Sequence, residues 1–283
     1  MARVGTSTEH EHESREEVTM AYQSFTYEAH EGIATVRLND PDKLNALTFQ
    51  TYGELETLTR ELAHDETVKV LVLTGTGKGF CSGGSVHEII GKLLEMKGDA
   101  LYDFTRMSCN VVENMRNLKK PIIAAVNGIA AGAGAMLALA SDLRIVSNNA
   151  KFAFLFVKVG LAGADMGALY LLPKIVGQGR ATELLLFGDP IDAQEAYRIG
   201  LANRVVSPEA LMEQTYQLAN RLKEGPLYAI GVTKELFKLE ADLDLESALE
   251  MEAMAQARCM QTPDFHEGYQ AFVEKRSPRF NRS

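Results

Sequence analysis

Two loops rich in glycine and alanine constrain this chain more than any other feature. Each follows an apolar, strand-like run; the first lies in VLVLTGTGKGFCSGGSVHEI, residues 70–89, and the second in PIIAAVNGIAAGAGAMLALASD, residues 121–142. Small side chains leave backbone N–H groups uncovered at the start of a helix, where the helix dipole also favours negative charge. If the two loops meet in space, the amides of Gly84 and Ala133 can stabilise a carbonyl oxygen as it becomes an oxyanion. The pattern therefore predicts chemistry on an acyl group.

The charge and composition of the chain exclude several other classes. The 283 residues carry a formal net charge of −9, which argues against nucleic acid and anionic membranes as partners. No apolar run approaches the roughly 20 residues that a membrane span needs. Three scattered cysteines indicate a reducing compartment without a disulfide framework, and no His/Cys/Asp cluster has metal-ligand spacing. We therefore expect a cytoplasmic protein with no metal.

The order of segments along the chain predicts an α/β fold. Residues 1–20 are polar, have little to bury and are expected to form a tail. Strand-like and helical segments alternate over residues 21–208, and residues 209–283 are helical in pattern, so we predict an α/β core with a helical C-terminal region. Within the core, the pattern predicts a strand over 151–156 and a helix over 86–96.

Five motifs, in order, resemble the enoyl-CoA hydratase/isomerase, or crotonase, superfamily. The resemblance covers residues 24–278, almost all of the segment that is expected to fold. One such motif would be weak support, whereas five in the order of the family are specific. The motifs are NDPDKLNAL at 39–47, GFCSGGSVHEI at 79–89, KPIIAAVNGIAAGAGAMLALASDLRI at 120–145, GQGRATELLLFGDPIDAQEAYRIGLANRVV at 177–206 and EGYQAFVEKRSPRF at 267–280.

The resemblance implies a spiral of ββα turns followed by a helical trimerisation region, in a homotrimer or a dimer of trimers. It implies an acyl-CoA substrate whose thioester carbonyl lies between the N–H groups of Gly84 and Ala133, with coenzyme A entering as part of the substrate and no separate cofactor. The implied substrate contacts include Phe272 and Lys275 from a neighbouring subunit, although an isolated lysine is often only a solvated surface charge. The full set of implied contacts is Lys43, Leu44, Ala46, Ser82, Gly84, Ser85, Val86, His87, Met136, Phe156, Phe272 and Lys275.

The chain departs from the family at its acid–base positions. Typical hydratases carry two glutamates that position and activate a water, and here Met136 and Phe156 occupy those positions. Neither side chain can deprotonate water or deliver a proton. Asp165, in GLAGADMGALYLLP, is the candidate replacement, because apolar neighbours should raise the pKa of its carboxyl. Asp165 also precedes a predicted helix and could instead cap it.

The reaction itself stays open among several alternatives. A hydratase-like lyase with non-standard acid–base residues is favoured, and an isomerase or a C–C or thioester hydrolase of the same family is the alternative. Because both glutamates are missing, a non-catalytic acyl-CoA-binding protein is a further alternative, as is a diketone hydrolase that does not use CoA. Met136 and Phe156 would suit a bulky acyl group. Weaker candidates for acid–base roles are His87 and Glu113, and Cys81 is expected to be a packed residue.

Overall fold

The computed structural model describes residues 22–280, so the predicted tail over residues 1–20 lies outside the described residues. Within this range the strands are β1 (Phe25–His30), β2 (Ile33–Leu38), β3 (Val70–Gly75), β4 (Gly79–Cys81), β5 (Ile122–Val126), β6 (Ile129–Ala131), β7 (Leu143–Ser147), β8 (Lys151–Ala153), β9 (Ile191–Asp192) and β10 (Arg204–Val206). The α-helices are α1 (Phe49–Leu62), α2 (Gly91–Leu93), α3 (Asp99–Asn117), α4 (Ala133–Ala140), α5 (Ala168–Val176), α6 (Gln178–Phe187), α7 (Ala193–Arg198), α8 (Leu211–Lys223), α9 (Leu227–Leu239), α10 (Leu245–Cys259) and α11 (Pro263–Val273). Shorter helical turns are η1 (Pro41–Lys43), η2 (Val86–Ile90), η3 (Leu155–Val159) and η4 (Glu240–Asp242).

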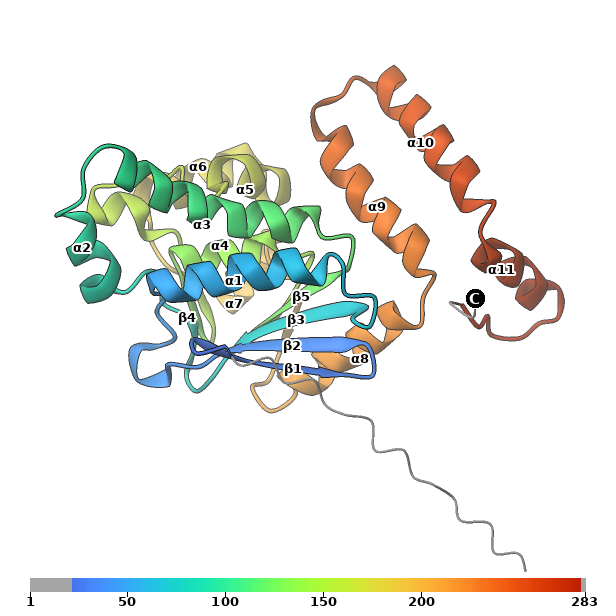
Figure 1. Cartoon of the computed structure of the whole chain (residues 1–283), viewed down its shortest axis with the longest axis horizontal. Coiled ribbons are helices and arrows are strands. Elements are labelled where there is room, and N and C mark those ends of the chain that lie inside the picture. Colours follow the sequence, from blue (N-terminus) through green and yellow to red (C-terminus); the bar gives the residue numbers. More distant parts are fainter. Residues whose placement is uncertain (1–21, 281–283) are drawn as a thin grey trace, which may run out of the picture.

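The core is a spiral in which successive strands from β3 to β8 alternate between two sheets. β3, β5 and β7 belong to a sheet of order β1-β2-β3-β5-β7-β10, whereas β4, β6 and β8 belong to one of order β4-β6-β8-β9. Each pair of strands is followed by helical structure before the chain returns to the first sheet, as Figure 1 shows for β3 and β4 followed by α3. This arrangement confirms the predicted α/β fold with ββα turns.

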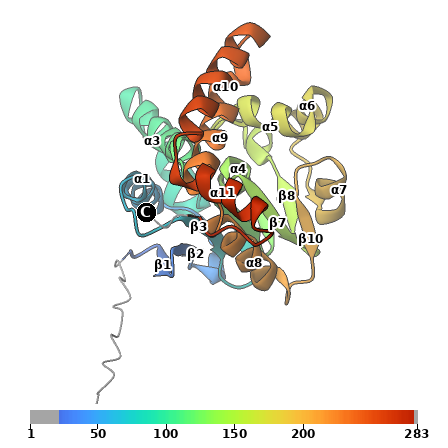
Figure 2. The same cartoon turned by 90° about the vertical axis from the view of Figure 1, so that its right-hand side faces the viewer.

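The strands of the large sheet are apolar because helices cover both of its faces. All six residues of β3 and all five of β5 are buried. α1, α3 and α4 lie on one face and α8 lies on the other, and each side has its own cluster of buried apolar residues (Figure 1). Figure 2 shows α5, α6 and α7 beside β8, at the edge away from α1. Continuous apolar runs are typical of parallel strands that are buried in this way.

Two predicted elements differ from the structure. The predicted strand over 151–156 ends at Ala153, and Phe156 lies in the 3-10 helix η3. β8 can pair with β6 only as far as Ala131, because Gly132 adopts φ 51° and turns the chain into α4. The predicted helix over 86–96 is divided into the π-helical turn η2 and the short helix α2.

The C-terminal helices fall into two groups by their packing. α8 packs on the large sheet, whereas α9, α10 and α11 form an arm that extends from the body (Figure 1). One contact between the arm and the body is made by Lys234 of α9, whose Nζ lies 2.7 Å from Asp142 Oδ2 and donates to Lys120 O at 2.9 Å. None of the helices between residues 22 and 280 has both the length and the apolar character that crossing a bilayer requires.

Candidate active site

Parallel pairing of β4 with β6 brings the two small-residue loops together. The loops follow the carboxyl ends of these strands, which are aligned at Cys81 and Ala130. They approach so closely that a Cβ added to Gly134 would lie 2.1 Å from Cys81 O. A Cβ added to Gly83 would lie 3.0 Å from Ala131 O and 3.7 Å from Ala133 N. Glycine at these positions is therefore required by the contact between two backbones.

The amide of Gly84 is free and points away from the neighbouring strand-like segment. Leu47 N donates to Gly83 O at 2.7 Å, and Ser85 N donates to Leu47 O at 2.8 Å. Because backbone groups alternate in direction along an extended segment, the intervening N–H of Gly84 points to the side opposite Leu47. No residue that the structure describes accepts a hydrogen bond from it.

The amide of Ala133 is the second free donor. Ala133 is the first residue of α4, and its N–H has no acceptor among the described residues, as is usual for the first turn of a helix. The positive φ of this loop falls on Gly132, so alanine is tolerated at the next position. Every residue of α4 is buried, which places its dipole in a medium that screens charge poorly. This amide is well suited to a negatively charged oxygen.

The segment DKLNAL lies against the first of these loops. Ser82 N donates to Leu44 O at 3.0 Å, and Ser82 Oγ donates to Lys43 O at 3.1 Å. The turn is held by Asn45, a buried residue with φ 57° whose Nδ2 donates to Thr76 O at 2.9 Å and Gly79 O at 2.8 Å. Sequence reasoning did not single out Asn45, although the Asn in this motif was the available signal.

Lys43 lies at a small polar pocket beside this segment. Its Nζ is 2.9 Å from Glu88 Oε1 and 3.6 Å from Asp40 Oδ2. The pocket has a volume of about 280 Å³ and is also lined by Ala46. The structure thus places the predicted residues Lys43, Leu44, Ala46 and Ser82 next to Gly84.

Met136 is a buried apolar residue of α4, and Phe156 is a buried apolar residue of η3. Asp165 lies between η3 and α5 and is partly buried, and this burial raises the pKa of its carboxyl, against a weaker opposing effect of the Met166 N–H. α5 begins after Gly167 without any side-chain cap, so the structure does not show the capping role considered for Asp165. The backbone turns sharply here, since Met166 has φ 48°.

The sequence and fold of this chain match those of known proteins. The family model described as enoyl-CoA hydratase/isomerase matches residues 28–283. The chain belongs to this family. The family assignment predicted from the motifs is therefore confirmed, and the protein is an enzyme of the enoyl-CoA hydratase/isomerase family.

Several relatives show how close the similarity is. The chain is 35% identical to a 1,2-epoxyphenylacetyl-CoA isomerase of Escherichia coli K12, over 88% of this chain and 95% of the relative. It is 35% identical to a crotonyl-CoA hydratase of Syntrophomonas wolfei, over 92% of this chain and 99% of the relative. The crystal structure of a proposed enoyl-CoA hydratase from Streptomyces coelicolor A3(2) superposes with a TM-score of 0.91 at 45% identity, covering 99% of this chain and 98% of that one.

Some of the residues predicted to contact the substrate lie away from the two loops. Phe272 is 84% exposed on α11, and Lys275 follows that helix, on the arm and away from β4 and α2 (Figure 1). Val86 and His87 are exposed at the start of η2, and Ser85 Oγ accepts from Glu88 N at 3.2 Å. Burial raises the pKa of the Cys81 thiol to about 12, which supports a packing role rather than a nucleophilic one.

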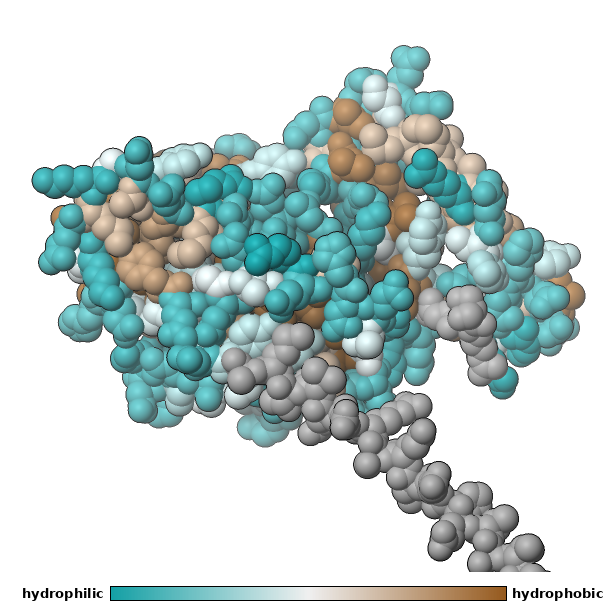
Figure 3. Space-filling model, in the orientation of Figure 1, coloured by the Kyte–Doolittle hydropathy of each residue, from teal (hydrophilic) through white to brown (hydrophobic). Residues whose placement is uncertain are grey.

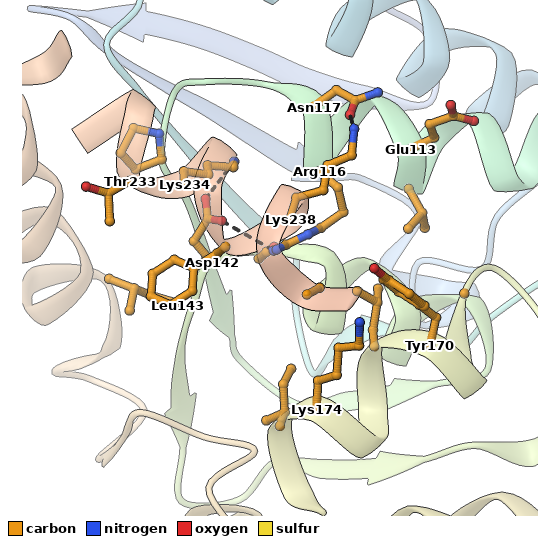
Figure 4. A pocket seen from close by; sticks show the side chains of 18 of the residues that line it. Glu113, Arg116, Asn117, Asp142, Leu143, Tyr170, Lys174, Thr233, Lys234 and Lys238 are labelled. Carbon is orange, nitrogen blue, oxygen red and sulfur yellow. Dashed lines mark hydrogen bonds and ion pairs between the residues drawn. The ribbon is translucent and has the colours of Figure 1, made fainter. Parts of the chain in front are cut away.

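A large cavity lies at the opposite end of α4 from Ala133. It has a volume of about 1080 Å³ and lies between α3, α5, α9 and the start of β7 (Figure 4). Its wall carries an ion cluster in which Asp142 lies 3.5 Å from Arg116 Nη1 and 2.7 Å from Lys234 Nζ. Glu113 lines this cavity and forms an ion pair with Arg106, so it is not placed at the loops. Across the described part of the chain, no group of three or more His, Cys, Asp or Glu residues is arranged to hold a metal ion.

Proposed function

We propose that this enzyme binds an acyl-CoA with its thioester oxygen between the amides of Gly84 and Ala133. The observation that carries the proposal is the pair of free N–H groups on two adjacent loops, one of them at the N-terminus of a buried helix. Donors fixed in this way stabilise the enolate that forms when charge moves onto the oxygen. One such donor contributes about 2.7–4 kcal/mol to transition-state stabilisation. Coenzyme A enters as part of the substrate, and the proposed reaction needs no other cofactor.

Hydration of an enoyl-CoA is the favoured reaction, with Asp165 as the group that moves the proton. Water attacks the β-carbon, the π electrons move toward the thioester oxygen, and the released proton passes to Asp165. The same carboxyl then protonates the α-carbon. The raised pKa of Asp165 suits both steps, and relatives named hydratases support this reaction.

Isomerisation of a double bond is a second candidate, because a single carboxyl is sufficient for it. Asp165 would remove a proton from one carbon and return it to another, with the same enolate between the two steps. The 35% identity to an isomerase supports this alternative. Mass spectrometry separates the two reactions when the enzyme is given enoyl-CoAs that differ in the position of the double bond. Hydration adds the mass of one water, whereas isomerisation leaves the mass unchanged.

Replacing the Ala133 N–H tests the oxyanion site directly. Proline is well tolerated at the first position of a helix, so Ala133→Pro removes the donor at the position where it disturbs α4 least. We expect kcat to fall by about 10²–10³ while the fold is kept. Ala133→Gly keeps the N–H and is the matched control, for which we expect most of the activity to remain. A folded Ala133→Pro variant with normal kcat would contradict the proposal.

We further propose a homotrimer, or a dimer of trimers, in the cytoplasm. Phe272 and Lys275 lie on the arm, away from the loops of their own chain, and can contact CoA only if they meet a neighbouring subunit. Three free thiols support a reducing compartment. The exposed apolar side chains of the arm support self-association.

A further inference from the structure

Arg144, in β7, is a buried cation without a carboxylate partner. The residue is only 4% exposed, and no ion pair joins its guanidinium to an acid among residues 22–280. The neighbouring carboxylate of Asp142 pairs instead with Arg116 and Lys234. Burial lowers the pKa of Arg144 to about 10, so the guanidinium stays charged near neutral pH. A buried charge is costly unless other groups compensate it.

Backbone carbonyls at the C-terminal end of α4 supply most of that compensation. Arg144 Nη1 donates to Ser141 O at 2.6 Å. The same nitrogen lies 3.4 Å from Ala138 O and 3.5 Å from Leu139 O, and Nε donates to Leu201 O at 2.6 Å. The last carbonyls of a helix have no partners within the helix and carry the negative end of its dipole, where a cation is favourable. Arg144 therefore places a full positive charge at this end of α4.

The other end of the same helix carries the free N–H of Ala133. α4 has eight residues, so at about 1.5 Å per residue its two ends are about 12 Å apart. All eight residues are buried, so water screens little of the field along the helix. At an effective dielectric constant of about 20, a unit charge at this distance stabilises an oxyanion enough to change a rate about tenfold.

We propose that Arg144 is a positioning residue that acts through α4. Its charge offsets the negative end of the helix dipole and holds that end in place, so that the Ala133 N–H presents a stronger positive potential to the thioester oxygen. This inference rests on the proposed binding of the thioester at Gly84 and Ala133. A neutral donor could satisfy the same carbonyls without burying a charge, so the hydrogen bonds alone do not require arginine.

The other charged groups at this end of α4 do not cancel the effect. Asp142 lies beside Arg116 and Lys234, as Figure 4 shows, and its single negative charge is offset by these two cations. With Arg144, the cluster holds three cations and one anion. The end of α4 that is remote from Ala133 is therefore positive overall.

The stretching frequency of a thioester carbonyl measures the proposed effect directly, because polarisation of the C=O bond lowers that frequency. The probe is butyryl-CoA, isotope-labelled at its thioester carbonyl carbon and observed by infrared difference spectroscopy. We expect its frequency to be lower when bound to the wild type than in water. Arg144→Gln removes the charge but keeps a donor, and it should show a smaller decrease. Arg144→Met is a second neutral variant with the same expected result, should Arg144→Gln not fold.

Kinetics of a short enoyl-CoA provide the second measurement. A neutral variant should lose about tenfold in kcat, whereas the dissociation constant of butyryl-CoA should change much less, because the oxygen carries its full charge only as the enolate forms. Arg144→Lys keeps the charge and should restore most of the carbonyl shift and of kcat. This rescue separates the charge of residue 144 from its shape.

Ser141→Ala is the matched control at the same end of α4, because the uncharged Ser141 Oγ donates to Leu137 O at 3.0 Å. It should lose thermal stability and keep both the carbonyl frequency and kcat. An Arg144→Gln or Arg144→Met variant with the wild-type frequency would overturn the inference, as would an equal loss in Arg144→Lys or Ser141→Ala. A wild type that fails to bind butyryl-CoA, or leaves its carbonyl at the frequency seen in water, would instead refute the proposed function, and with it the inference.

Discussion

At the scale of single residues, the candidate site depends on two features: small residues in the two loops, and the partly buried carboxyl of Asp165. Gly134 is required because its Cα lies against Cys81 O, whereas Ala133 is tolerated because Gly132 takes the unusual backbone angle. Asp165 differs from both, since it carries an ionisable side chain, and burial raises the pKa of its carboxyl. The pH dependence of the enzyme should therefore report on Asp165.

We expect kcat/KM to rise with pH through the pKa of Asp165, because the carboxyl must be ionised to accept a proton. Burial raises that pKa, so this limb should lie above the ordinary carboxyl range near 4. Asp165→Asn should lose the limb and about 10²-fold or more in kcat. A pH–rate profile of both forms is the measurement, and an unchanged profile in Asp165→Asn would exclude Asp165 from the proton transfer.

The free energy of unfolding should fall as pH rises through the pKa of Asp165, whereas kcat/KM should rise. Because the folded-state pKa of Asp165 is raised, the folded protein holds this proton more tightly than the unfolded chain does. The protonated carboxyl thus favours folding below its unfolded-state pKa, and that advantage is lost as pH rises through the folded-state pKa. Asp165→Asn should be more stable than wild type at neutral pH, by a margin that disappears in acid. Thermal unfolding at several pH values measures it.

At the scale of elements, the arm depends on one buried ion cluster. Lys234 of α9 is 7% exposed and lies 2.7 Å from Asp142 Oδ2, at the point where α4 leads into β7 (Figure 4). Asp142 also accepts from Ile122 N at 2.7 Å, so the same carboxylate joins α9 to β5. Removing Lys234 takes away the shorter of the two cationic contacts of Asp142 and leaves the carboxylate with only Arg116, 3.5 Å away, so that its charge is less well compensated.

Lys234→Ala should therefore lower the free energy of unfolding by about 3 kcal/mol and loosen α9 from the body. Hydrogen exchange of α9 together with chemical denaturation measures both effects. Lys119→Ala is the matched control at the same contact, because Lys119 pairs with Glu235 of α9 at 2.9 Å but on the exposed surface. We expect little change from it. Equal effects of the two substitutions would show that the buried cluster does not fix the arm.

The sequence allowed the elements of the core to be predicted better than their ends or some of the side chains at the site. Apolar runs predicted the strands at 70–75 and 122–126, because parallel strands that are buried on both faces leave a clear signal. The strand around residues 151–156 was predicted too long, since its length depends on the partner strand rather than on its own residues.

At the scale of the whole molecule, the arm exposes a group of large apolar side chains. Figure 3 shows apolar side chains gathered over α9 and α10. The large cavity opens beside α9. Patches of this kind mark interfaces between proteins. The exposed large apolar residues of α9 and α10 and the turn between them are Tyr228, Phe237, Leu239, Leu243, Leu245, Leu249 and Met254.

Phe237→Arg should reduce association, because Phe237 is 75% exposed and lines the cavity. Light scattering at low micromolar concentration should show a trimer or hexamer for the wild type and a smaller species for the variant. Leu94→Arg is the control, since Leu94 is 83% exposed but lies just after α2, at the other end of the molecule. Wild-type protein that remains monomeric at high concentration would refute the proposed assembly.

The complete burial of α4 has a consequence for how such an enzyme can change. A helix that is packed on every side by core residues is held rigidly. The Ala133 N–H at its first position therefore needs no rearrangement when a substrate binds. Asp165 stands outside this helix, on the turn between η3 and α5. A change of the acid on that turn would therefore alter the proton transfer of the proposed reaction without moving the Ala133 N–H.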